Sequence, residues 1–267
     1  MIEILKVIGI ALGCTVAVLL GLVVLYVLFL LVSVLFVNTK KEYETRSNFF
    51  ENLFSLSAYL ACKILLMKVI VTGKEKLPEG RFLFVCNHRS NFDPIITRWA
   101  FWKQDISFIS KPENFKIPVA KQLMVRCRYL SIDRENPRNS MKTLLKAIDY
   151  IKTNQGSIGI YPEGTRSKDG KLLPFHDGIF KVAQKADVPV VVATIVGSEN
   201  VKKCYPFRRT VIHLDVLDVI LPDKTKSSHD ISDTVRSLME DKISEYEGGR
   251  VELNEVESSV VATETTE

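Results

Sequence analysis

Two short blocks of polar residues contain side chains suited to acid–base chemistry. In the first, residues 87–94 read Asn-His-Arg-Ser-Asn-Phe-Asp-Pro, directly after an apolar run at 82–86. Within a helix, the spacing of His88 and Asp93 would place them on different faces, but a strand-to-helix loop could fold back and bring them together. Asp93 would then fix the tautomer of His88 and leave its other ring nitrogen free to accept a proton. The alternative is structural, with Asp93 as an N-cap before Pro94.

The second block, residues 161–167, reads Tyr-Pro-Glu-Gly-Thr-Arg-Ser and is followed by two lysines. A glycine loop that combines Arg, Lys and hydroxyl groups can hold a phosphate through backbone donors and a bidentate guanidinium. It is not a nucleotide-binding P-loop, because Leu172 stands where Ser or Thr would bind magnesium. The alternative is a charged surface hairpin.

Both blocks follow predicted strands, and the pattern beyond Thr72 alternates strands with helices, which indicates an α/β domain with helices covering a sheet. The predicted strands are 81–86, 106–109, 129–132, 157–161, 190–196 and 211–219. The predicted helices are 94–102, 114–126, 138–153, 175–186 and 230–246.

Residues 7–37 contain no charged side chain. As a helix they would be about 47 Å long, against a hydrocarbon core of about 30 Å, which predicts a single membrane span. A cleaved signal peptide would have a shorter apolar region and a small-residue cleavage site. Lys40, Lys41 and Arg46 follow the span, and this bias places the C-terminal part in the cytoplasm.

Gly9, Gly13, Ala17 and Gly21 form a stripe of small residues that would let two copies associate through this helix. The alternative is that glycine is simply frequent in membrane helices. Residues 49–71 have the spacing of an amphipathic helix, which would lie at the membrane interface or pack on the domain core.

The cysteine content and the net charge limit the classes of ligand and partner that the chain can have. The five cysteines are scattered and lack metal-site spacing, so neither a disulfide framework nor a zinc site is expected. The formal net charge is +5 although residues 245–267 are acidic, so the rest of the chain is distinctly basic. In a chain that begins with a membrane segment, this favours anionic lipid or a phosphorylated substrate over nucleic acid.

Taken together, the two blocks resemble the signatures of the 1-acyl-sn-glycerol-3-phosphate acyltransferase (lysophosphatidic acid acyltransferase) family, an Asn-His-x4-Asp block and a Pro-Glu-Gly-Thr-Arg block about 70 residues later. Two weaker blocks occur in the same order along the chain as in the family. The resemblance covers residues 72–222. One comprises Lys111, Phe115-Lys116-Ile117-Pro118 and Ile132-Asp133-Arg134, and the other is Val188-Pro189-Val190-Val191-Val192. The chain departs from the family at Val192, where a second proline is common, and at His176, where Lys is common.

The resemblance implies a glycerolipid acyltransferase-like fold, a mixed sheet flanked by helices, and a set of roles. His88, oriented by Asp93, would deprotonate a lysolipid hydroxyl, and the alkoxide would attack an acyl thioester, either acyl-CoA or acyl carrier protein. The implied substrate-binding residues are Lys111, Arg134 and Arg166 for the phosphate, and Glu163, Gly164 and Thr165 in the loop. Glu163 and Gly164 would shape the glycerol end of the acceptor. No metal or bound cofactor is required. Cys86 is expected to pack as a small buried hydrophobe rather than act as a nucleophile.

The expected function is transfer of an acyl group to the sn-2 hydroxyl of 1-acyl-sn-glycerol-3-phosphate, giving phosphatidic acid. Alternatives are another lysophospholipid or glycerol 3-phosphate as acceptor, or a non-catalytic lipid-binding protein. The expected organisation is a membrane anchor at 1–40, an amphipathic helix or linker at 41–71, an acyltransferase domain at 72–245 and an acidic disordered tail at 246–267. The chain would be a single-pass membrane protein with its catalytic domain in the cytoplasm.

Overall fold

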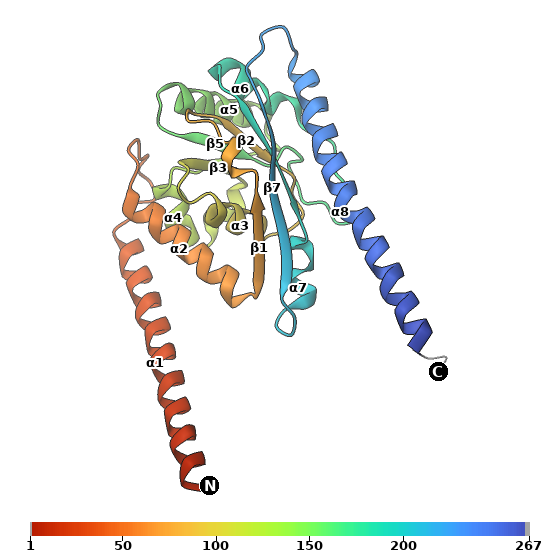
Figure 1. The fold of residues 1–267 in the computed structure, drawn as a ribbon. Helices are drawn as coiled ribbons and strands as arrows, with labels where there is room; N and C mark the ends of the chain where they lie inside the picture. Colours follow the sequence, from red (N-terminus) through yellow and green to blue (C-terminus); the bar gives the residue numbers. More distant parts are fainter. Residues whose placement is uncertain (1, 265–267) are drawn as a thin grey trace.

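The computed structural model describes the backbone of residues 2–264 and the side chains of residues 2–248. In this part of the chain, helix α1 (Ile2–Leu35) leads into a domain of alternating strands and helices (Figure 1). The strands are β1 (Met67–Thr72), β2 (Leu83–Cys86), β3 (Ile106–Ser110), β4 (Leu130–Ser131), β5 (Ser157–Ile160), β6 (Val190–Val196) and β7 (Thr210–Ile220). The other helices are α2 (Asn48–Ile64), α3 (Asp93–Ala100), α4 (Ala120–Arg126), α5 (Pro137–Lys152), α6 (Lys181–Ala186), α7 (Val201–Cys204) and α8 (Ser228–Glu264). Short 3-10 turns are η1 (Lys74–Lys76), η2 (Pro112–Lys116), η3 (Asp177–Ile179) and η4 (Ser198–Asn200).

The described strands form one seven-stranded sheet in the order β1-β7-β6-β2-β5-β3-β4. Neighbours are parallel except for β6 and β7, which are antiparallel. The sheet is therefore mixed, which confirms the expected fold class. Strands β2 to β6 all end at the same side of the sheet, the carboxyl-terminal edge, and β1 and β7 begin there.

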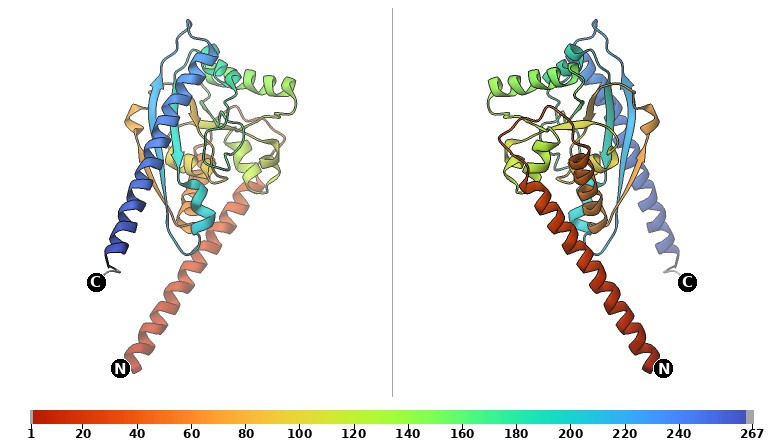
Figure 2. Two further views of the ribbon diagram at one scale, coloured as in Figure 1. Left: turned by 90° about the vertical axis from the view of Figure 1, so that its right-hand side faces the viewer. Right: turned by 90° about the vertical axis from the view of Figure 1, so that its left-hand side faces the viewer.

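Helices cover both faces of the sheet (Figures 1 and 2). The side chains of β2 alternate between two cores, with Phe84 and Cys86 in one and Leu83 and Val85 in the other, and all four are fully buried. Helices α2, α3 and α4 contribute to the first core, and α5, α6 and α8 to the second. Because both faces are covered, the central strands are mainly apolar, as expected of parallel strands.

The predicted helix over residues 49–71 is wrong in its second part. Helix α2 ends at Ile64, Leu66 has a left-handed backbone (φ 54°), and β1 then pairs along its length with β7. The run Val69-Ile70-Val71 is β-branched, and such residues favour a pleated, half-buried surface over a helix. The sheet therefore begins at Met67, before the expected domain boundary at residue 72. One face of α2 packs on the core, while Phe49 and Leu56 stay exposed.

Three other predicted segments need correction. Residues 114–126 are split into η2 and α4, because Pro118 cannot continue a helix. Residues 175–186 are split into η3 and α6 around Gly178, a weak helix former. Helix α8 continues to Glu264 through the segment expected to be a disordered tail from residue 246, since extending an existing helix requires no new nucleus. The expectation for residues 265–267 lies outside the described part of the chain.

Helix α1 is long and apolar enough to cross a membrane, and it is the one such helix among the described residues. Its last turns pack on the domain: the Tyr26 and Ser57 hydroxyls are 2.7 Å apart, and Val34 packs with Leu53 and Leu123. The preceding residues, 2–25, are exposed and would extend about 36 Å, enough for one span of about 30 Å. The helix is thus joined to the domain through α2 and α4.

A buried ion pair fixes α2 to α3. Arg98 donates to the Glu51 carboxylate at 2.5 Å, to the Glu51 carbonyl at 3.1 Å and to the Ser55 hydroxyl at 3.0 Å. Both charged side chains are only 2% exposed. Such a pair is costly to break from one side, because the remaining charge stays buried without a partner.

We therefore expect Glu51→Ala to destabilise the domain by about 3 to 5 kcal/mol, because Arg98 would lose its counter-ion. The measurement is the thermal unfolding midpoint of the detergent-solubilised chain. Glu75→Ala, which removes an exposed carboxylate, serves as the control and should leave the midpoint unchanged. Equal midpoints for the two variants would contradict the prediction.

Candidate active site

The loops that leave the carboxyl-terminal edge bring the two sequence blocks together. Residues 87–92 follow β2 and residues 161–166 follow β5, and these strands are neighbours in the sheet. Lys111 follows β3, and Arg134 comes shortly after β4. In open α/β sheets, ligands bind outside the carboxyl ends of parallel strands. The topology therefore places every site residue expected from the sequence at the position where such folds form their sites.

Asp93 lies at the centre of this arrangement and is fully buried. One carboxylate oxygen accepts from the ring Nδ1 of His88 at 2.8 Å and from the backbone N–H groups of Arg89 and Ser90, each at 2.7 Å. The other accepts from the Ser198 hydroxyl at 2.5 Å. These four contacts satisfy a buried carboxylate that would otherwise be strongly destabilising.

The same contacts decide between the two interpretations of Asp93. Its carboxylate points back to the loop before α3 and caps no N–H group of the first helical turn. A role as a simple N-cap is therefore wrong, and the carboxylate faces His88.

The ring of His88 is held between Asp93 and Tyr161. It stacks on the Tyr161 ring with centroids 4.4 Å apart and an interplanar angle of 23°. Its side chain is 17% exposed, and its Nε2 makes no hydrogen bond with any described residue. With Nδ1 donating to Asp93, Nε2 is the nitrogen that can accept a proton.

Glu163 ties the second block to the first. It is buried, and its two oxygens accept from the backbone N–H groups of His88 at 2.6 Å and Leu173 at 2.9 Å. Burial raises the pKa of Glu163, while these two hydrogen bonds act in the opposite direction. Both oxygens accept from backbone donors, so the carboxylate of Glu163 links the loop after β2 to the loop after β5. We call this pair of contacts the Glu163 brace.

Gly164 lies close to two basic side chains, Arg134 and His176. This glycine has a φ of 70°, and a Cβ atom there would lie 2.8 Å from Nε2 of His176 and 3.6 Å from a guanidinium nitrogen of Arg134. The side chains of Lys111, Thr165, Arg134 and Arg166 are exposed and make no hydrogen bond or ion pair with the described residues. Unpaired cations in the loops at this edge of the sheet are suited to binding an anion.

Three residues that hold the site in place were not predicted from the sequence. The side chain of Asn87 forms two hydrogen bonds with the backbone of Ile195, at 3.0 and 2.7 Å, and so fixes the loop to β6. Ser198 and Tyr161 hold Asp93 and His88. The available signal was position, because Ser198 follows a predicted strand just as the other site residues do.

A second His–Asp contact shows that distance alone does not make a site. Nδ1 of His229 lies 2.9 Å from the Asp177 carboxylate, almost the same distance as in the first pair. The side chain of His229 is 69% exposed and that of Asp177 is 40% exposed, so water competes for the hydrogen bonds of both groups. His88 and Asp93 differ from this pair by their burial and by the loops fixed around them.

The fold and the sequence of this chain both match those of known acyltransferases. The acyltransferase family model matches residues 68–196. The crystal structure of the 1-acyl-sn-glycerophosphate (LPA) acyltransferase from Thermotoga maritima has a similar fold, with a TM-score of 0.62 and 25% identity, covering 74% of this chain and 79% of that one.

The 1-acyl-sn-glycerol-3-phosphate acyltransferase of Escherichia coli (strain K12) is 30% identical over 171 residues, which cover 63% of this chain and 69% of that protein. A chloroplastic 1-acyl-sn-glycerol-3-phosphate acyltransferase of Brassica napus is 37% identical over 136 residues, covering 50% of this chain and 39% of that protein. The chain therefore belongs to the acyltransferase family, among relatives of the 1-acyl-sn-glycerol-3-phosphate acyltransferases. It spans less than half the length of the plant relatives it matches.

The brace formed by Glu163 leads to a graded prediction. Glu163→Ala should leave two backbone donors without acceptors and lower stability by about 1 to 3 kcal/mol for each donor that stays buried. Glu163→Gln keeps one acceptor oxygen, so its loss should be smaller. Thermal unfolding in detergent checks the order wild type, Gln, Ala, and equal losses for the two variants would rule out the brace.

Proposed function

We propose that the protein transfers an acyl group from an acyl thioester to the sn-2 hydroxyl of 1-acyl-sn-glycerol-3-phosphate. The observation that carries this proposal is the 2.8 Å contact between Nδ1 of His88 and Asp93, which leaves Nε2 free at the edge of the sheet whose loops also carry Lys111, Arg134 and Arg166. Family membership supports the reaction class, and the acceptor is chosen from the chemistry of the loops.

In the proposed reaction, Nε2 of His88 takes the proton of the acceptor hydroxyl while Asp93 stabilises the imidazolium. The oxygen attacks the thioester carbonyl and forms a C–O bond. Collapse of the tetrahedral intermediate breaks the C–S bond, and the proton on His88 passes to the leaving thiolate. The products are an ester and a free thiol, so His88 returns to its starting state without a covalent acyl-enzyme.

Cys86 is unsuited to an alternative covalent route. It is fully buried in β2, and burial raises the pKa of its thiol well above the usual range. A thiol in this environment stays protonated, and the nucleophilic form of cysteine is the thiolate.

We assign the acceptor phosphate to Arg134 and Arg166, with Lys111 at the neighbouring strand end. The exposed guanidinium of Arg134 next to Gly164 supports this assignment. Glu163 and Gly164 shape the loop, Glu163 through its backbone hydrogen bonds and Gly164 through its left-handed conformation. Thr165 is exposed beside them and can donate to the same phosphate.

His176 is the observation that favours a second candidate acceptor. It lies against Gly164, at the position where the sequence departs from the Lys of the family pattern, so the fixed positive charge beside the loop is reduced. Another lysophospholipid, with a headgroup beyond the phosphate, would tolerate this change.

The proposed location is a single membrane span by α1, with the domain on the cytoplasmic side. The exposed and mainly apolar residues 2–25 support the span, and the following Lys40, Lys41 and Arg46 support this orientation. The acceptor would then stay in the bilayer, and acyl-CoA or acyl carrier protein would arrive from solution. Association of two copies through the stripe of small residues on α1 stays a prediction.

The base role predicts that His88→Ala lowers the rate of acyl transfer by about 10³-fold or more while the chain remains folded and membrane-bound. The measurement is phosphatidic acid formation from lysophosphatidic acid and acyl-CoA or acyl carrier protein in mixed micelles. His229→Ala removes the imidazole of the exposed pair and should leave the rate unchanged. Unchanged transfer by His88→Ala would exclude the mechanism.

The phosphate role predicts that Arg166→Ala raises the KM for the acceptor by about tenfold with a smaller effect on kcat, because one charge-assisted contact to the phosphate is lost. Lys224→Ala, an exposed cation at the other end of the domain, is the matched control. If the acceptor KM of Arg166→Ala equals that of wild type, Arg166 does not belong to the phosphate site.

A further inference from the structure

Two neighbouring turns form a protrusion at the end of the domain from which α1 projects. One turn joins α2 to β1 (residues 61–68), and the other comprises α7 and its connection to β7 (residues 201–211). They lie side by side, because Met67 pairs with Thr210 and the Thr210 N–H donates to the Leu66 carbonyl at 3.0 Å. We call this pair of turns the basic tip.

The basic tip exposes large apolar side chains that the fold leaves uncovered. Phe207 is 92% exposed, so its ring has almost no contact with the rest of the domain. Four further side chains of the tip are exposed hydrophobics, and they are Ile64, Leu66, Tyr205 and Val211. An exposed apolar cluster of this kind indicates an interaction site.

Cations surround this cluster. Six side chains of the tip carry positive charge and are exposed, and they are Lys63, Lys68, Lys202, Lys203, Arg208 and Arg209. Neither segment contains Asp or Glu, and the six cations make no ion pair with any described residue. Aromatic and aliphatic groups within a ring of unpaired Lys and Arg match the chemistry of an anionic lipid surface, whose headgroups are negative and whose interior is apolar.

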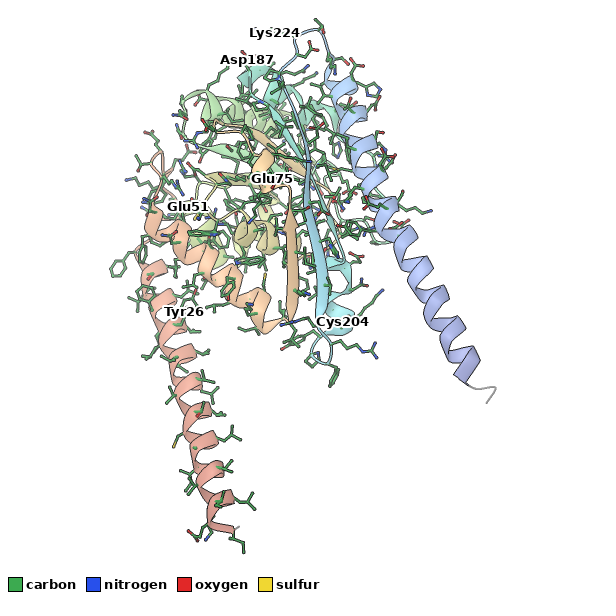
Figure 3. All side chains as sticks on the ribbon, viewed as in Figure 1. Tyr26, Glu51, Glu75, Asp187, Cys204 and Lys224 are labelled. Carbon is green, nitrogen blue, oxygen red and sulfur yellow. The ribbon has the colours of Figure 1, made fainter. Side chains whose placement is uncertain are left out.

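The position of the tip fits the same partner. Figure 3 shows Cys204, within the tip, at about the level of Tyr26 on α1, while Lys224 lies at the opposite end of the molecule. Both views of Figure 2 agree that the connection between α7 and β7 is at the end where α1 leaves the domain. Because β1 and β7 begin at the carboxyl-terminal edge, the tip also lies on the side of the sheet that carries His88 and Asp93.

We propose that the basic tip docks on the anionic surface of the bilayer that α1 enters, as a second contact between the domain and the membrane. Phe207 and Tyr205 insert among the headgroups, and the surrounding Lys and Arg side chains pair with lipid phosphates. A helix and a separate tip together fix the tilt of the domain, so the carboxyl-terminal edge faces the lipid. This inference rests on the membrane span of α1 and is independent of acyl transfer.

The test measures the depth of a tryptophan placed in the tip. The full chain carrying Phe207→Trp is reconstituted into anionic nanodiscs whose lipids are brominated near the headgroup end of the acyl chain. Leu221→Trp is the matched control, because Leu221 is 71% exposed just beyond the far end of β7. Trp99 and Trp102 give both variants the same background. Quenching should be at least about twofold greater at residue 207 than at residue 221, since interfacial side chains reach the acyl boundary.

The second part of the experiment tests whether the cations of the basic tip contribute to docking. In the Phe207→Trp chain, Arg208→Glu with Arg209→Glu should reduce the quenching, whereas Lys224→Glu with Lys226→Glu should not. Zwitterionic nanodiscs should also reduce it, because the attraction depends on anionic lipid. Tyr205→Trp provides an independent probe should the first variant fold poorly.

Equal quenching at residues 207 and 221 would overturn the proposal. So would a probe that bromolipid leaves unquenched but that responds to an added acidic carrier protein, which would assign the tip to a protein partner. Neither readout requires catalysis, so failure of the proposed acyl transfer would not be confused with failure of membrane docking.

Discussion

The structure depends on a carboxylate that is completely removed from water. An unpaired ionised side chain in that position would cost far more than a domain's net stability, so Asp93 dictates what surrounds it. Its four donors come from the loop after β2 and from Ser198 after β6. The loop must fold back to supply them, and that conformation turns the His88 ring toward the open edge of the sheet. The same loop conformation therefore satisfies the buried charge of Asp93 and positions His88, the proposed base.

Much of this arrangement could be predicted because it is local. The two polar blocks each follow a short apolar run, and parallel strands bring such positions to one edge whatever their separation in sequence. The contact between His88 and Asp93 needed only a loop able to reverse, and each predicted strand overlaps an observed one. The mixed sheet was expected from the resemblance to the family, and β7, antiparallel to β6, gives it that character.

What could not be predicted is non-local. Residues 67–72 continue the apolar spacing of α2. Their β-branched run favours a strand locally, but the strand that they pair with, β7, lies about 140 residues further along the chain. The hydrogen bonds from Asn87 to Ile195 and from Ser198 to Asp93 join positions more than a hundred residues apart. Glu163 was expected to shape the glycerol end of the acceptor, yet its oxygens are engaged by backbone groups. A side chain's partner depends on register, which residue type does not encode.

The strand order also has a consequence for biosynthesis. The central strand β2 lies between β5 and β6, which are synthesised much later, and β1 pairs only with β7. No part of the sheet's centre can therefore close until most of the chain has left the ribosome, and such long-range pairing is intrinsically slow. Among the described elements, helix α1 is synthesised before any strand. With α1 spanning the membrane as proposed, the nascent chain would be anchored at the bilayer before the sheet is complete.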